Sequence, residues 1–374
     1  MNNKFSKNCV YLTLAGSHSY GTALPTSDYD IKGVIIPDRR YFLGFNSNFE
    51  QLEDKEEITA AFGGLIPSLL KGEKLDGVLY DIRKYFKLAS DCNPNVLEPL
   101  FVRPEDVLQL NSVFQPVIDN REKFLSRRAL HTYSGYSFSQ LKRMRTHREW
   151  LMNPPKQKPE RQDFGLNEHT TKINKELRDF LFSKIRQITD SWKFDLSEVR
   201  PAVRDDIMEK VTTYVESLTA DVQYTEFHAA GKQLGLDDNI LEELDRERKY
   251  KAALDYYRQY NNWETNRNPV RHEIEKRLGY DSKNALHLVR LLTTCEDILK
   301  TGTFETYRPD RQFLLDIRNG AMTYDEILKW AEDKNAELKV LSETSPLRKK
   351  PDINFLEEMQ METVDRFFSS KQNS

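Results

Sequence analysis

Cysteine is scarce in this chain: its 374 residues include only three, Cys9, Cys92 and Cys295, which lie far apart in the sequence. Their odd number and wide spacing argue against a disulfide framework or a zinc site and are typical of a reducing compartment. No apolar stretch approaches the roughly 20 residues that a membrane helix needs, and the apolar run near the N-terminus is too short for a secretory signal. We therefore expect a cytoplasmic protein that does not contact a membrane.

A strong charge of one sign is also missing, as are several common catalytic motifs. The net charge is -3, so no overall basic field indicates nucleic acid, and any site for a polyanion must be local. The sequence holds neither a G-x-x-x-x-G-K-[ST] loop nor a G-x-S-x-G elbow. Its seven histidines are scattered rather than clustered. These absences argue against a P-loop NTPase, an α/β-hydrolase and a histidine-based metal centre.

The most informative segment that is present lies near the N-terminus. An apolar run at residues 10–14 leads into Gly16 and Ser17, and then into two aspartates one residue apart, Asp28 and Asp30. Strand side chains repeat their direction every second residue, so the two carboxylates face the same way and can share hard cations. The glycine-serine turn offers backbone N–H groups to phosphate oxygens. Each part alone is common in a turn or a solvated strand end, but their order, with a second apolar stretch at 33–36, favours a nucleoside triphosphate site.

Two-metal phosphoryl transfer usually needs a third carboxylate, and two aspartates could supply it. Asp76 and Asp81 flank the apolar run of LDGVLYDIRKYF and would point to opposite faces of one strand. Asp81 immediately precedes a helical pattern, where an aspartate has the ordinary role of an N-cap, worth about 1 kcal/mol. Asp76 has no such role, so we choose Asp76 as the third acid and keep Asp81 as the alternative.

Gly-Ser followed by Asp-x-Asp is the signature of the DNA polymerase beta superfamily of nucleotidyltransferases, which this chain resembles. More narrowly, it resembles the predicted nucleotidyltransferases associated with RNA repair, of the RlaP type. The likeness includes IRKYFKLASDCNPNVLEPLF at 82–101 and GYDSKNALHLVRLL at 279–292, and it covers roughly residues 8–105 and 265–341.

The resemblance implies a two-metal nucleotidyltransferase site. Asp28, Asp30 and Asp76 would be its catalytic acids and the ligands of two Mg²⁺ ions, with Mn²⁺ as an alternative. The residues expected to bind the triphosphate of an NTP such as ATP from the turn itself are Gly16, Ser17, Tyr20 and Gly21.

Basic residues near the C-terminus are expected to meet the charge of the triphosphate. Lys283, His287 and Arg290 lie on nearly one face of a predicted helix, and Arg318 lies in a turn further along. The resemblance places them in a helical part that closes on the catalytic domain. The alternative is a buried histidine and arginines that join helices by salt bridges, and for His287 taken alone this alternative is the stronger one.

A locally basic stretch at 121–150 is the candidate site for an acceptor. Aromatic and basic residues, among them Tyr136 and Arg143, step along one helical face, and such a face can stack bases and hold phosphates. The opposing interpretation, a solvated helix with half-buried tyrosines, is equally compatible with the pattern.

The predicted fold class is α+β, with a small mixed-sheet nucleotidyltransferase domain followed by a largely helical domain. Strands are expected at 9–15, 28–36 and 75–80, and a helix from residue 82 to about residue 90. We place the catalytic domain at 1–120, the helical domain at 121–345 with a loop or linker at 151–170, and a loosely held tail at 346–374. Amphipathic periodicity predicts further helices around 173–188 and 207–218.

The expected activity is transfer of an NMP from an NTP to an acceptor hydroxyl, which the resemblance suggests is an RNA 3′ end in RNA repair. The alternatives are nucleotidylation of a protein or small molecule, and a non-catalytic regulator that binds nucleotide or RNA.

Overall fold

The computed structural model describes residues 6–25, 27–66, 75–166 and 238–372, together with the single residues Leu69, Ser183 and Lys232. The chain divides into two compact units. The first consists of Met1–Leu151 and His272–Ser374, and the second of Met152–Arg271.

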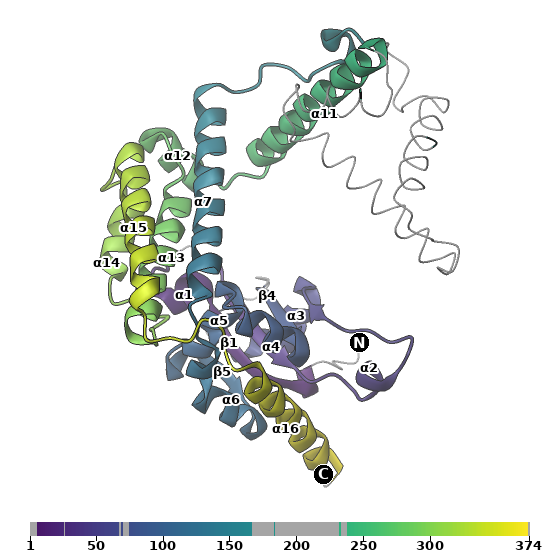
Figure 1. Cartoon of the computed structure of the whole chain (residues 1–374), viewed down its shortest axis with the longest axis vertical. Helices are drawn as coiled ribbons and strands as arrows, with labels where there is room; N and C mark the ends of the chain where they lie inside the picture. Colours follow the sequence, from purple (N-terminus) through teal and green to yellow (C-terminus); the bar gives the residue numbers. More distant parts are fainter. Residues whose placement is uncertain are drawn as a thin grey trace. The chain divides into compact units, whose positions relative to one another are not determined.

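A five-stranded mixed sheet forms the base of the first unit (Figure 1). Its strands are β1 (Cys9–Ala15), β2 (Asp30–Ile35), β3 (Gln51–Leu52), β4 (Asp76–Asp81) and β5 (Val107–Leu110), in the order β3-β4-β2-β1-β5. Strands β2 and β4 are parallel, whereas the other neighbouring pairs are antiparallel. The central strands β1, β2 and β4 therefore carry most of the hydrogen-bonded ladder.

Both faces of this sheet are buried, and this explains why its strands are largely apolar. One face, with Leu12, Ile31 and Leu79, packs on α3 (Lys55–Phe62) through Ile58 and Phe62. The opposite face belongs to a larger core that extends into the helices. Because strand side chains alternate, Asp30, Lys32 and Val34 all lie on this second face.

The helices of the first unit come from both ends of the chain. The N-terminal part contributes α1 (Gly16–Tyr20), α2 (Arg40–Leu43), α3, α4 (Ile82–Ser90), α5 (Pro94–Leu97), α6 (Gln115–Asp119) and most of α7 (Ala129–Met152). The C-terminal part contributes most of α12 (Pro269–Leu278), then α13 (Ser282–Thr301), α14 (Arg311–Arg318), α15 (Tyr324–Thr344) and α16 (Ile353–Gln372).

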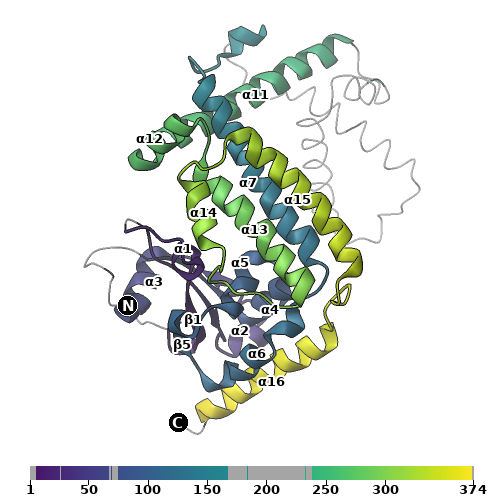
Figure 2. The ribbon, with the colours of Figure 1, turned by 90° about the vertical axis from the view of Figure 1, so that its left-hand side faces the viewer.

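Helix α13 is the centre of the helical layer. It contacts both α14 and α15, and α7, α13 and α15 run side by side in Figure 2. The hydroxyl of Ser134 on α7 also lies 3.1 Å from the side-chain oxygen of Asn335 on α15. Buried residues occupy most positions of α13, as expected for a helix that is covered on several sides.

The second unit includes a 3₁₀ turn at Arg161–Phe164 and helix α11 (Asp238–Thr265). The turn packs on α11, where Arg161 pairs with Glu247 and the ring of Phe164 meets that of Tyr250. The helices predicted around 173–188 and 207–218 lie outside the described residues. Among the helices that the structure describes, none combines the length and the hydrophobicity that crossing a bilayer requires.

The predicted fold class is confirmed: a mixed N-terminal sheet with helices is followed by a helical region. The three predicted strands correspond to β1, β2 and β4, and the predicted helix corresponds to α4. The short strands β3 and β5 were not predicted, because two and four residues carry too little periodicity to stand out.

The C-terminal segment differs from the loosely held tail that its polar composition predicts. Residues Ile353–Gln372 form α16, which contacts α4 and α6. Leu356, Met359 and Phe367 are buried in the larger core. Spaced by three and eight residues, they form one apolar stripe that the polar residues between them conceal in the sequence.

Phe367→Ala should lower the free energy of unfolding by about 3 kcal/mol, since a buried phenyl ring is lost. Met361, which is 58% exposed on the same helix, provides the matched control, and Met361→Ala should change stability by less than about 0.5 kcal/mol. Urea denaturation of both variants measures this. Equal, small effects would show that α16 does not pack on the core.

Candidate active site

The glycine-serine turn forms the start of α1, directly after β1. Gly16 has φ 63° and Gly21, at the end of the helix, has φ 73°, both in the left-handed region that favours glycine. A Cβ on Gly16 would lie 2.3 Å from Oδ2 of Asp30. Glycine is therefore favoured at position 16 for two reasons: the backbone conformation there, and the close approach of the Asp30 carboxylate.

Asp30 and Asp76 lie side by side on neighbouring strands. They are register partners at the start of the parallel pair β2 and β4, and both line one pocket of about 330 Å³. Asp28 is exposed in the loop just before β2. The pKa of Asp30 is raised, first by burial and then by the charge of Asp76, with a smaller contribution from Asp28. Negative charge is thus concentrated where cations would relieve it.

Asp28, Asp30 and Asp76 do not form a group whose ligand atoms all lie within 4.8 Å of one another. The exposed Asp76 accepts from Nζ of Lys55 on α3 at 2.7 Å. Among the residues that the structure describes, the group whose ligand atoms all lie within 4.8 Å of one another is a different one: His147, Glu275 and Asp281.

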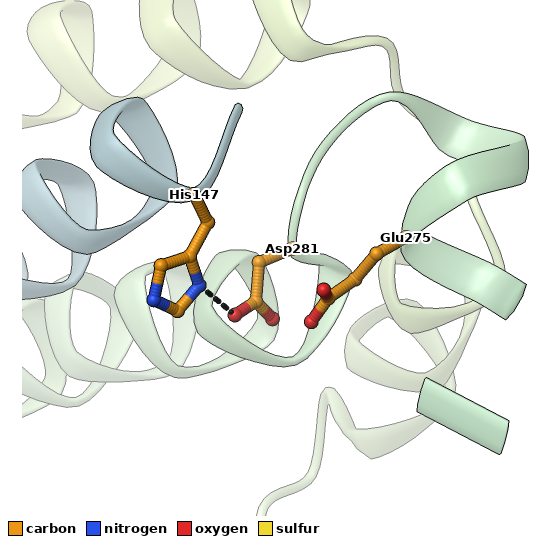
Figure 3. Close-up of side chains that lie close together, drawn as sticks. All are labelled: His147, Glu275 and Asp281. Atoms are coloured by element: carbon orange, nitrogen blue, oxygen red, sulfur yellow. Dashed lines mark hydrogen bonds and ion pairs between the residues drawn. The ribbon is translucent and has the colours of Figure 1, made fainter. Parts of the chain in front are cut away.

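This other group joins three helices rather than lining the pocket. His147 comes from α7, Glu275 from α12, and Asp281 is the N-cap of α13 (Figure 3). Nδ1 of His147 lies 2.9 Å from Oδ2 of Asp281, whose carboxylate also accepts from the backbone and side chain of Asn284. Capping of α13 accounts for Asp281 at this position.

The pocket is lined by residues of the sheet and by a second set of residues, which we call the wall of the pocket. Residues 14–16 of β1 and α1, 30–32 of β2 and 76–78 of β4 line one side. Asn95, Glu98, Pro99, Val102 and Thr306 line the other. The pocket therefore combines the carboxylates of the strand ends with residues from the segment around α5 and from the C-terminal part.

Glu98 is the charged residue at the centre of that wall. It is 3% exposed and accepts from Nη1 of Arg290 at 2.7 Å and from the hydroxyl of Tyr20 at 2.9 Å. The guanidinium of Arg290 also lies 3.8 Å from the ring centroid of Tyr20. Burial alone would lower the pKa of Arg290, but Glu98 and Tyr20 more than offset this and keep it charged.

Arg290 was predicted to contact the triphosphate. In the structure it is buried and paired with Glu98. It is 5% exposed and binds the wall of the pocket through Glu98. Its partner Tyr20 lines the pocket, as does Gly16, whereas Gly21 packs on the ring of Tyr307. Ser17 is half-buried on α1, and its carbonyl accepts from the amide of Thr22.

Two of the remaining basic residues of the C-terminal part, Lys283 and Arg318, interact with these acids or with the end of the turn. Lys283 is exposed on α13, and its charge opposes the upward shift in the pKa of Asp30. His287, one turn further, is half-buried. Arg318, at the end of α14, donates from Nη1 to the carbonyl of Thr22 at 3.4 Å, just beyond the α1 turn.

The predicted acceptor residues on α7 do not line this pocket. Tyr136 donates from its hydroxyl to Oδ1 of Asn93 at 3.3 Å, beside the start of α5. Arg143 is exposed on the same helix.

The alternative third acid, Asp81, has the structural role that its sequence context indicates. It is 1% exposed, and its Oδ1 accepts from the backbone N–H of Arg83 as the N-cap of α4. The guanidinium of Arg83 binds both of its oxygens. Asp81 therefore lies at the far end of β4 from Asp76.

Sequence reasoning missed three charged residues of the pocket region: Lys32, Lys55 and Glu98. Lys32 could have been found, because it continues the two-residue spacing of Asp28 and Asp30 along the predicted strand. Burial lowers its pKa, although nearby carboxylates, Asp30 first, oppose the shift. Glu98 and Lys55 carry no such local signal, since only the fold brings them to the strand ends.

A mixed sheet with a glycine turn after its first strand and acids on two adjacent strands is the class of site that nucleotidyltransferases of the DNA polymerase beta superfamily use, typically with divalent metals. Residues 1–157 match the RNA repair pathway DNA polymerase beta family, RlaP.

One curated relative, from Enterobacteria phage T4, is named "Uncharacterized 38.9 kDa protein in nrdC-mobD intergenic region". It is 33% identical over 123 residues, which are 32% of this chain and 34% of the relative. The match thus spans about a third of the relative's length. No solved structure matches the chain significantly.

Glu98→Leu should lower the free energy of unfolding by about 3–5 kcal/mol, because Arg290 is left buried without its carboxylate. The double variant Glu98→Leu/Arg290→Met should lose clearly less than the sum of the two single variants. Chemical denaturation of the four proteins in this cycle measures the coupling.

The exposed pair Arg366–Glu362 on α16, with side chains 56% and 66% exposed, is the matched control. Its coupling should stay below about 1 kcal/mol. Additive losses at Glu98 and Arg290 would contradict a buried pair.

Proposed function

We propose that this protein is a magnesium-dependent nucleotidyltransferase that moves an NMP from an NTP to an acceptor hydroxyl. The family match over residues 1–157 supports the class of reaction. The single observation that carries the proposal for this chain is the contact between Gly16 and Asp30, with Asp76 in register beside Asp30. Gly16 and the two carboxylates line the same pocket, which supports the proposal that phosphate and cations bind there together.

The donor set suits a hard divalent cation. Carboxylate oxygens are the ligands that Mg²⁺ prefers. The pKa of Asp30 is raised first by burial and then by the charge of Asp76 beside it. Asp28, Asp30 and Asp76 would hold two Mg²⁺ ions, or Mn²⁺. When bound, the ions neutralise the triphosphate and lower the pKa of the acceptor hydroxyl. The Lys55–Asp76 pair is exposed, and such pairs are weak enough to exchange for a cation.

The chain's own groups would position the nucleotide. The backbone N–H groups at Gly16 and Ser17, at the start of α1, would bind phosphate oxygens. Arg290 acts through Glu98, which holds Tyr20 against the pocket, so Arg290 is a positioning residue. The exposed Lys283, with His287 and Arg318 nearby, would balance the charge of the triphosphate.

The acceptor oxygen would attack the α-phosphorus in line. A new P–O bond forms to the acceptor, the bond to the bridging oxygen breaks, and pyrophosphate leaves while the hydroxyl proton passes to solvent or to a nearby carboxylate. Catalysis of this kind relies on positioning and charge neutralisation rather than on a covalent enzyme intermediate.

An RNA 3′ end is the acceptor that the family's RNA repair pathway favours. Tyr136 and the exposed Arg143 on α7 are the residues we propose for contact with it, because aromatic and basic side chains together bind single strands. Transfer to a protein or small molecule, and binding of nucleotide or RNA without transfer, are the alternatives that an acceptor assay separates.

Asp28→Asn combined with Asp30→Asn should reduce transfer from an α-³²P-labelled NTP at least about a thousandfold, since the acids that would hold the cations are lost. The assay offers each NTP with a pool of RNAs and follows label on RNA and on protein. Circular dichroism confirms that the variant is folded. Undiminished transfer would end the proposal.

Gly16→Ala should also abolish transfer, because its Cβ meets Asp30 and its φ is unfavourable for alanine. Gly64→Ala is the matched control: Gly64 is exposed in a 3₁₀ turn after α3, where an added Cβ has nothing within 4 Å. A Gly16→Ala enzyme as active as Gly64→Ala would show that the turn does not grip the substrate.

A further inference from the structure

Lys32 occupies the position next to the acidic edge of the pocket. It follows Asp30 by two residues on β2, so both side chains lie on the same face of the sheet. Its register partners are Val78 on β4 and Thr13 on β1. The Asp30–Asp76 pair lies at the strand ends, and Lys32 lies two register positions further along β2.

The Lys32 side chain belongs to the pocket rather than to the apolar core. It lines the same pocket as Gly16, Asp30, Asp76 and Glu98. Its Nζ lies 5.9 Å from the ring centroid of Tyr80. Lys32 is half-buried.

Two of the acids around Lys32, Glu98 and Asp76, are already engaged by other cations or donors. Glu98 binds Arg290 and Tyr20, and Asp76 binds Lys55. Within the described ranges, no carboxylate oxygen lies within 4.0 Å of the Lys32 amine, which makes no ion pair. An ammonium that is partly removed from water without a partner is costly, so a purely structural role would place an apolar residue here, as at Val34.

We propose that the inner end of the pocket is an anion subsite, in which the Lys32 ammonium binds a phosphate oxygen of the nucleotide. This inference rests on the proposed function and names the residue that extends its phosphate site inward from Gly16. Successive residues on one strand face lie roughly 7 Å apart. A lysine side chain reaches across that distance, so Lys32 and the α1 turn can hold different oxygens of one polyphosphate.

The opposing account is that Lys32 only offsets the charge of Asp30, Asp76 and Glu98. That account predicts altered stability or altered metal affinity in Lys32 variants, but no loss that depends on the phosphates of the ligand. Ligands that differ in their phosphates therefore separate the two.

Isothermal titration with inorganic tripolyphosphate, ATP and adenosine, with Ca²⁺ replacing Mg²⁺ to prevent turnover, tests the subsite directly. Lys32→Met should weaken tripolyphosphate and ATP binding about tenfold to a hundredfold, the range for a lost charged hydrogen bond, while the affinity for adenosine stays unchanged. Lys32→Arg should restore most of the loss. Lys84→Met, which removes a lysine paired with Glu50 away from the pocket, should bind all three ligands as the unaltered protein does.

Transfer assays on the same proteins distinguish the two hypotheses. If the unaltered protein transfers label and Lys32→Met binds tripolyphosphate equally well, the subsite is wrong and the proposed function stands. If tripolyphosphate binding depends on Lys32 but no acceptor is labelled, the subsite stands and the proposed function is wrong. Should Lys32→Met fail to fold by circular dichroism, Lys32→Gln replaces it, and unchanged tripolyphosphate binding by that variant would overturn the inference.

Discussion

The buried contact between Glu98 and Arg290 is the constraint on which the site depends. It joins the segment after α5 to α13, which the chain supplies 192 residues later, and its third member, Tyr20, belongs to the α1 turn. Removing a charge pair from water is costly, and hydrogen bonds to the pair offset part of that cost. Here one oxygen of Glu98 accepts from Arg290 and the other accepts from Tyr20. Through this one carboxylate, the helical layer contacts the α1 turn beside the strand ends.

Around that contact, charges alternate in a way that suits a polyanion with its cations. Asp30 and Asp76 present negative charge at the strand ends, Lys32 presents positive charge further in, and Lys283 presents it from outside. Neither sign dominates the chain as a whole, which has a net charge of -3. A local arrangement of this kind selects ligands by position rather than by long-range attraction.

The parts of the fold and site that could be predicted from sequence were those encoded by short-range periodicity. The spacing of Asp28 and Asp30, the run that became β1, and the N-cap position of Asp81 all follow from local rules, and the structure has β1 and the Asp81 cap as expected. The contact between Glu98 and Arg290 could not be predicted, because the two residues are 192 positions apart and only the folded chain brings them together. The packing of α16 was hidden for a related reason: three buried side chains among many polar ones give a weak stripe.

The discontinuous composition of the first unit has a consequence for synthesis on the ribosome. Its two segments, Met1–Leu151 and His272–Ser374, are separated in the chain by 120 residues of the other unit, Met152–Arg271. A nascent chain that has completed the sheet still lacks the α13 guanidinium that closes on Glu98. The pocket is therefore completed late in translation. A chain that stops before α13 contains the acids at the strand ends and Glu98, but lacks Arg290, the cation that pairs with Glu98.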